Sequence, residues 1–176
     1  MLSFQDITIE NWNKVAGSIL RSEKSFKKAI RTEKEDYAEI LMDGDALIKV
    51  AFIGEKYVGN AIGYPPTEIE LEEDELDGYK NTRFLYLFNI VIDKKYQGRG
   101  YGNQLLKEFL VTAKEKGYHK VIGHFRPNGS LALLKKFGGK EIRICPNWEN
   151  THEDYSFCEL DLSKLQISES VLTVRN

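Results

Sequence analysis

The chain alternates between short apolar runs and segments whose apolar residues recur at helical spacing. The run FLYLFNIVI, residues 84–92, is apolar on both faces, which is typical of a strand in the middle of a sheet. After a short polar link, apolar residues follow a helical stripe over 105–113, and Gly117 is placed to end that helix. The pattern predicts a buried strand followed by a helix that packs on the sheet.

The amino-terminal part predicts two helices. Apolar residues between positions 12 and 20 have helical spacing, and Thr8 precedes them as a candidate N-cap. Thr32 and Glu35 have the spacing of a capping box, which predicts the start of a second helix.

A hairpin and an acidic stretch follow these helices. Residues 46–53 and 57–64 are apolar strand candidates separated by GEK, and Pro65-Pro66 ends the second of them. Seven acids lie between positions 68 and 77. We predict a solvated loop there, with the alternative that its charge attracts a cationic substrate.

The carboxy-terminal part predicts three strands and a short helix. The strand candidates are 119–125, 141–145 and 154–162, and the helix lies in 128–139 with Asn128 or Ser130 as its cap. The elements together predict one α/β domain over 1–162, with a mixed, mostly antiparallel sheet of about six or seven strands and about four helices. Residues 163–176 form a carboxy-terminal extension to which the sequence assigns no role.

Composition narrows the classes of partner. The 176 residues carry a net charge of −2, so no basic excess indicates nucleic acid or an anionic membrane as a partner. The amino terminus lacks the pattern of a secretory signal, and the longest uncharged apolar run is too short to span a bilayer, so we expect a cytoplasmic protein. Cys145 and Cys158 fall in predicted strands and are expected to be reduced core residues, and no metal site is predicted.

The segment QGRGYG, residues 97–102, lies between the most apolar strand and the amphipathic helix. Glycines allow successive backbone N–H groups to converge on an anion, and the amino terminus of the following helix adds positive potential. Arg99 adds a charge suited to phosphate. The spacing fits neither a P-loop, which needs Lys-Ser or Lys-Thr after its last glycine, nor a dinucleotide-binding fingerprint.

The stretch NIVIDKKYQGRGYGNQLL, residues 89–106, resembles the signature of the GCN5-related N-acetyltransferase (GNAT) family. Gln97, Gly100 and Gly102 fill the three defining positions of its Q/R-x-x-G-x-G/A motif. The predicted order of elements over about residues 3 to 162 is also similar to that of the family.

The resemblance implies an acetyl-CoA site. The backbone of the signature strand would pair with the pantetheine arm, the amides of the turn would hold the diphosphate, and the start of the next helix would touch the cofactor. The residues so implied are Ile90, Val91, Ile92, Gln97, Gly98, Arg99, Gly100, Tyr101, Gly102, Asn128 and Ser130. The alternatives are strand core for the three aliphatic residues and helix capping for Asn128 and Ser130.

Two positions depart from the family pattern. Leu134 stands where many members have a tyrosine that protonates the thiolate, and Asn89 stands where many have a carboxylate. We name Tyr155 as a substitute acid and Asn89 as a residue that positions water or the amine. His152 is a candidate base, and Glu35, Asp36 and Glu39 lie where the family shapes its acceptor pocket. On its strand, His119 has the opposite parity to His124, so at most one of them faces a given site.

The function implied is transfer of the acetyl group of acetyl-CoA to a primary amine, carried by a small molecule or by a protein. The alternative is a non-catalytic module that senses CoA or acyl-CoA. We expect a monomer or a homodimer.

Overall fold

The computed structural model of the protein describes residues 1–73, 75–80 and 82–165. Its seven strands form one sheet in the order β1-β2-β3-β4-β5-β7-β6. Neighbouring strands are antiparallel except β4 and β5, which are parallel. The strands are β1 (Leu2–Asp6), β2 (Leu47–Ile53), β3 (Lys56–Tyr64), β4 (Phe84–Ile92), β5 (Lys120–Phe125), β6 (Lys140–Cys145) and β7 (Tyr155–Asp161).

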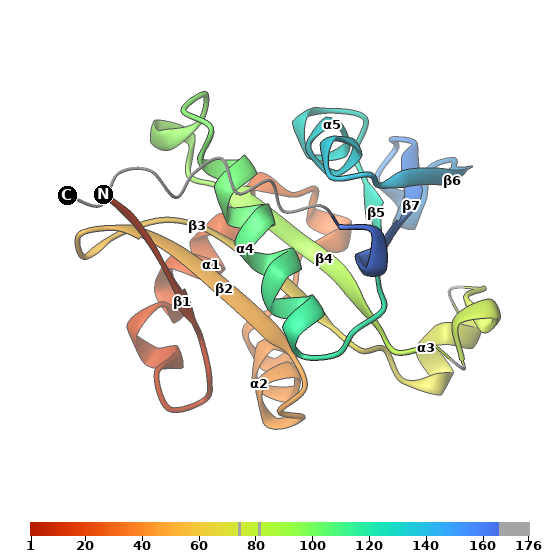
Figure 1. The fold of residues 1–176 in the computed structure, drawn as a ribbon, viewed down its shortest axis with the longest axis horizontal. Coiled ribbons are helices and arrows are strands. Elements are labelled where there is room, and N and C mark those ends of the chain that lie inside the picture. Colours follow the sequence, from red (N-terminus) through yellow and green to blue (C-terminus); the bar gives the residue numbers. More distant parts are fainter. Residues whose placement is uncertain (74, 81, 166–176) are drawn as a thin grey trace.

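Helices cover both faces of this sheet (Figure 1). The α-helices in the described ranges are α1 (Ala16–Ser22), α2 (Lys34–Met42), α3 (Glu68–Glu73), α4 (Tyr101–Glu115) and α5 (Gly129–Lys136). The apolar stripe of α4 packs with α5 on one face, where Leu105, Phe109 and Leu134 belong to the largest core cluster. On the other face, α1 and α2 place Ile19 and Tyr37 against the hairpin of β2 and β3.

The architecture confirms the predicted α/β fold, including the hairpin, the central strand and the helix after the glycine turn. Strand β1 was not predicted. It is a short edge strand that pairs only with β2, and three of its five residues are exposed, so it carries little apolar signal. Both cysteines are free thiols in strands, as expected, with Cys158 buried and Cys145 half-buried.

Local details of the predicted helices differ from the structure. Thr8 caps no helix: its hydroxyl bonds Glu10, a short 3₁₀ turn covers Trp12–Lys14, and α1 begins only at Ala16. The capping box of α2 is formed by Glu33 and Asp36, not by Thr32 and Glu35. The capping box therefore lies one residue later than predicted, and the backbone N–H of Thr32 instead donates to the buried side chain of Glu23.

The acidic stretch is also more ordered than the predicted loop. Glu68–Glu73 form α3, and Asp77–Tyr79 form a 3₁₀ turn. The spacing of Leu71 and Leu76 explains this, since both are buried against Phe84 of β4. These two buried leucines, one in α3 and one between the two elements, hold the charged segment against the sheet.

The carboxy-terminal end of the described chain packs into the core. Leu165 is buried in the core cluster beside Leu162. Residues 166–176 of the predicted extension lie outside the described residues. Within the described ranges, no helix is both long and apolar enough to cross a membrane.

Candidate functional site

The sheet opens between β4 and β5. The two strands pair only from Phe84 to Tyr86, opposite Lys120 to Ile122, although β4 continues to Ile92. At Gly123 the strands are still in close contact, since a Cβ there would lie 2.5 Å from the carbonyl oxygen of Leu87. Beyond this point they diverge, and the edge of β4 that faces β5 has no strand partner in the described sheet.

A β-bulge lies where the strands separate. In the ladder with β3, Asn89 pairs with Ile62 and Leu87 pairs with Gly63, so Phe88 is the extra residue on β4. A bulge bends its strand and redirects the side chains next to it. As a result the neighbours Leu87 and Phe88 both line the same cavity.

That cavity has a volume of about 1080 Å³ and extends along the opening between the strands. Such a volume suits a cofactor-sized ligand. It is lined by ten of the eleven predicted cofactor residues: Ile90, Val91, Ile92, Gln97, Gly98, Gly100, Tyr101, Gly102, Asn128 and Ser130. The eleventh, Arg99, is exposed, and its guanidinium lies 6.0 Å from the centre of the Tyr96 ring.

Two glycines of the turn adopt a left-handed backbone conformation. Gly98 and Gly100 have φ angles of +74° and +76°, which L side chains rarely adopt, and a Cβ at either position would meet open space. Gly100 is the N-cap of the 15-residue helix α4, so its neighbourhood combines free backbone amides with the positive end of a helix dipole. The side chain of Gln97 donates to the carbonyl of Ile92 at 2.8 Å, which fixes the turn to the end of β4.

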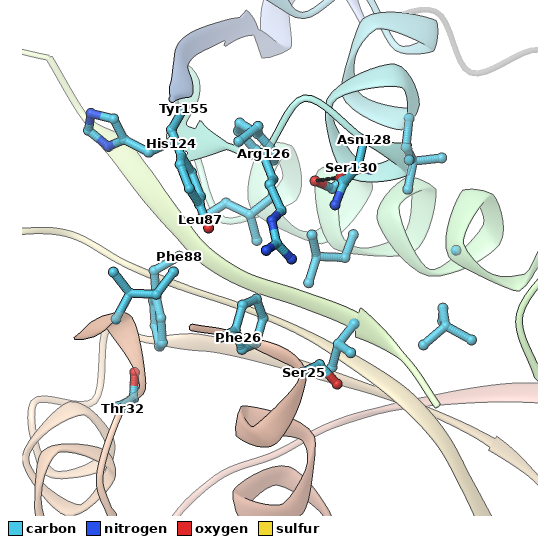
Figure 2. A pocket seen from close by; sticks show the side chains of 18 of the residues that line it. Ser25, Phe26, Thr32, Leu87, Phe88, His124, Arg126, Asn128, Ser130 and Tyr155 are labelled. Atoms are coloured by element: carbon cyan, nitrogen blue, oxygen red, sulfur yellow. Dashed lines mark hydrogen bonds between the residues drawn. The ribbon is translucent and has the colours of Figure 1, made fainter. Parts of the chain in front are cut away.

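The start of α5 forms a second part of the same end of the cavity. Asn128 caps this helix, as predicted: its side-chain oxygen accepts from the backbone N–H of Ser130 at 3.0 Å and from the Ser130 hydroxyl at 2.9 Å. Both residues also line the cavity, so the capping and lining positions coincide. Figure 2 shows them on the opposite side of the cavity from Phe88 and His124.

Tyr155, the first residue of β7, lies beside the bulge. Its side chain is 6% exposed and lines the cavity. In Figure 2 its hydroxyl points toward β4 near Leu87. Burial raises the pKa of Tyr155 above the ordinary tyrosine value, so the hydroxyl keeps its proton at neutral and moderately alkaline pH.

The structure does not bring Asn89 to the cavity. Its side chain is buried on the other side of β4, where it donates to Glu23 at 2.6 Å and accepts from Asn60 at 2.7 Å. Tyr37 donates to the same oxygen of Glu23 at 2.5 Å, and the other oxygen accepts from the backbone of Thr32 at 3.0 Å. Burial raises the pKa of Glu23 above the ordinary glutamate value. Through these hydrogen bonds the side chain of Glu23 links β4 to the segment before α2.

The remaining candidates divide by position. His152 and His119 are exposed and outside the cavity, whereas His124 lines it. Asp36 lines it from α2, and Glu35 and Glu39 do not. Only one of His119, which precedes β5, and His124, within β5, lines the cavity, as their opposite parity predicted.

Lys27, Arg126 and Glu153 form an ion-paired clasp next to the cavity, which Arg126 lines. Arg126 donates to both oxygens of Glu153, at 2.5 and 2.7 Å, and Lys27 lies 3.0 Å from the same carboxylate. These three residues come from the segment before α2, the end of β5 and the loop before β7. Next to them, the 3₁₀ turns Lys28–Ile30 and Trp148–Asn150 contact each other. The clasp therefore holds together two segments that both contribute residues to the cavity lining.

We expect the clasp to depend on the charge of Glu153. Hydrogen bonds from Arg126 and Lys27 lower the pKa of Glu153 to about 2. Because the folded-state pKa is below the unfolded value, the stabilising contribution is present above about pH 4.5 and is lost as the pH falls toward 2. Glu153→Gln should speed amide hydrogen exchange in residues 26–32 by about fivefold at neutral pH, and added salt should speed exchange in the wild type more than in the variant.

A matched control is Asp161→Asn. Asp161 also has a lowered pKa, owing to hydrogen bonds from Ser163, but it lies at the end of β7 outside the cavity. Exchange in residues 26–32 should not respond to it. Equal exchange rates in wild type and Glu153→Gln would show that the clasp does not restrain these loops.

Sequence reasoning missed the far end of the cavity, opposite the glycine turn. Tyr64, Tyr86, Phe88, Trp148 and Glu70 all line it. No local motif joins these residues, since they come from β3, β4, α3 and the loop before β7. The one signal in the sequence was the acidic stretch 68–77, which could lie near a site. One of its residues, Glu70, does line the cavity.

Comparisons with known proteins agree with this geometry. The profile of the acetyltransferase (GNAT) family matches residues 10–138. A search of curated protein sequences gives no significant match.

Similar solved structures include the ribosomal-protein-S18-alanine N-acetyltransferase from Escherichia coli, with 18% identity, a TM-score of 0.68, and 97% of this chain and 99% of that chain covered. The loading GNATL domain of CurA from Lyngbya majuscula has 12% identity and a TM-score of 0.69, with 93% and 98% covered. A GNAT family acetyltransferase from Elizabethkingia anophelis, with acetyl-CoA bound, has 18% identity and a TM-score of 0.61, with 91% and 97% covered. At these identities the likeness shows the fold.

Proposed function

This chain belongs to the GNAT family of acetyltransferases, which use acetyl-CoA as co-substrate, and from that membership we propose that it acetylates a primary amine. The observation that carries the proposal is the cavity along the opening between β4 and β5. It is lined by the glycine turn, the unpaired edge of β4, and the Tyr155 side chain. An acyl donor and an acceptor could therefore meet beside one buried proton donor.

The residues present fit coenzyme A. The backbone N–H groups from Gln97 to Gly102, at the start of α4, would hold the diphosphate, since two of the glycines adopt conformations that expose the backbone. The edge of β4 at residues 90–92 would pair with the amide groups of the pantetheine arm. Asn128 and Ser130 would contact that arm from α5. Arg99, which is exposed, would attract the diphosphate from outside the cavity by its charge alone.

Acetyl-CoA supplies an acetyl group activated as a thioester. The amine nitrogen forms the new N–C bond and the C–S bond breaks. The amine loses a proton to water, and the leaving sulfur gains one. We assign the last proton to the hydroxyl of Tyr155, whose raised pKa keeps it protonated. The backbone at the bulge of Phe88 would stabilise negative charge on the carbonyl oxygen. The bent strand and the clasped loops would hold the two reactants in contact and exclude bulk water.

The proposal predicts thiol release from acetyl-CoA that depends on an added primary amine. It is tested with a panel of monoamines, polyamines and peptides with free amino termini, by following free thiol and confirming the acetylated product by mass spectrometry. The rival function, a CoA sensor without turnover, predicts tight acetyl-CoA binding with no thiol release from any amine. That result would overturn the proposed activity.

A further inference from the structure

The end of the cavity away from the glycine turn is walled by a continuous series of rings. The aromatic wall consists of Phe88, Tyr64, Tyr86, His124 and Trp148, all of which line the cavity. The ring of Phe88 meets Tyr64 edge-on with centroids 5.4 Å apart, and Tyr64 lies 6.2 Å from Tyr86. The Tyr86 hydroxyl is 2.6 Å from Nδ1 of His124, whose ring stacks on Trp148 at 3.5 Å and 12°. Each ring is therefore fixed by its neighbours.

This wall is uncharged at neutral pH. Burial, with the positive charge of Arg143 nearby, lowers the pKa of His124 to about 3, so its ring is neutral. The Nε2 atom of His124 is buried without a hydrogen-bond partner among the described residues. The ring consequently presents a flat, neutral face rather than a cation that would repel an approaching ammonium group.

Charged residues of both signs line the cavity, with Arg31, Arg126 and Lys136 as its cations. Glu70, Asp36 and Glu149 line the cavity, and Glu70 accepts from the hydroxyl of Tyr64 at 3.1 Å. Two cations of this region are engaged elsewhere. Arg126 is paired with Glu153, and the side chain of Arg31 donates to the backbone carbonyls of Phe26 and Lys24. The three carboxylates are the groups of this lining that would attract a protonated amine.

We propose that the acceptor is a primary amine joined by a short linker to an aromatic ring, with that ring packed on the aromatic wall. The inference rests on the proposed function and names its substrate class. Packing of one aromatic ring on another contributes binding free energy beyond that from buried apolar area. An aromatic group should therefore bind this wall more tightly than a saturated group of equal size. Phe88 is the extra residue of the bulge and belongs to the wall, and Figure 2 shows Tyr155 in the same part of the cavity. In the proposed pose a short linker joins the ring on the wall to the amine beside Tyr155.

The test compares 2-phenylethylamine with 2-cyclohexylethylamine, which have the same linker and similar volume. Spermidine and a short peptide with an amino-terminal alanine complete the set. We measure kcat/KM for each amine and, separately, its affinity for the CoA-loaded protein by calorimetry. The aryl amine should exceed its cyclohexyl partner by about fivefold in both quantities, and should exceed spermidine and the peptide.

Variants of the wall residues test whether the wall causes the preference for the aryl amine. Tyr64→Leu and Trp148→Leu should bring the aryl-to-cyclohexyl ratio close to one, whereas Tyr64→Phe and Trp148→Phe, which keep a ring, should retain most of it. Ile9→Ala, at an exposed residue outside the cavity, is the control for unchanged rates.

The outcomes separate the two proposals. A ratio near one in the wild type, a ratio unaffected by both leucine variants, or a clear preference for spermidine or the peptide would overturn the aromatic assignment while leaving acetyl transfer intact. Preferential binding of the aryl amine without acetylation of any amine would overturn the proposed function and support the aromatic site as a binding site.

Discussion

Gly100→Val should raise the dissociation constant for acetyl-CoA by about 100-fold while the protein remains folded. A side chain at Gly100 would extend into the space that lines the turn, at the N-cap of α4, where we place the diphosphate. Loss of one or two hydrogen bonds to a charged group accounts for an effect of this size. Since the φ angle is +76°, valine also strains the backbone and costs about 2 kcal/mol of folding free energy. Calorimetric titration with acetyl-CoA measures the first effect, and denaturant unfolding measures the second.

Gly44→Val is the matched control for that strain. Gly44 has a φ angle of +73°, a Cβ added there would also have nothing within 4 Å, and the residue lies outside the cavity. Both variants should lose similar stability, and only Gly100→Val should lose affinity. Equal affinity for acetyl-CoA in the two variants would place the diphosphate away from this turn.

The fold and the part of the cavity at the glycine turn were predictable because their signals are local. The central strand, the glycines and the stripe of α4 follow one another within about thirty residues, and each pattern reports directly on burial or backbone conformation. The capping role of Asn128 has the same origin, because a cap bonds its own helix. Edge strand β1 gave no comparable signal, since most of its side chains face solvent.

The end of the cavity away from the glycine turn depends on contacts between distant segments, and sequence patterns do not encode these. Asn89 illustrates the limit. Strand alternation alone leaves open which face of β4 it occupies, and the bulge at Phe88 shifts the pattern within the strand itself. The position of Asn89 follows instead from Glu23, a residue 66 positions away, whose carboxylate accepts its amide. The clasp on Glu153 likewise joins three segments with no common motif.

Tyr155→Phe should lower kcat for acetyl transfer by about 100-fold with little change in the KM for acetyl-CoA. The substitution keeps the ring in its buried position and removes only the hydroxyl to which we assign protonation of the leaving sulfur. A positioned general acid contributes at least about this factor. Steady-state kinetics with a saturating amine acceptor measures it. A kcat within error of the wild type would show that the sulfur receives its proton from another source.

The pH dependence and a second tyrosine make this test specific. A general acid can donate its proton only below its pKa. Because burial raises the pKa of Tyr155, ionisation of this hydroxyl should not reduce wild-type kcat at moderately alkaline pH.

Tyr118→Phe removes the hydroxyl of another tyrosine that is also 6% exposed, but this one lies outside the main cavity and donates to the carbonyl of Asp45. It should cost about 1 kcal/mol of stability and leave kcat unchanged. A matching fall in kcat for both variants would trace the effect to lost stability, because only one of the two hydroxyl groups lies beside the bulge of β4.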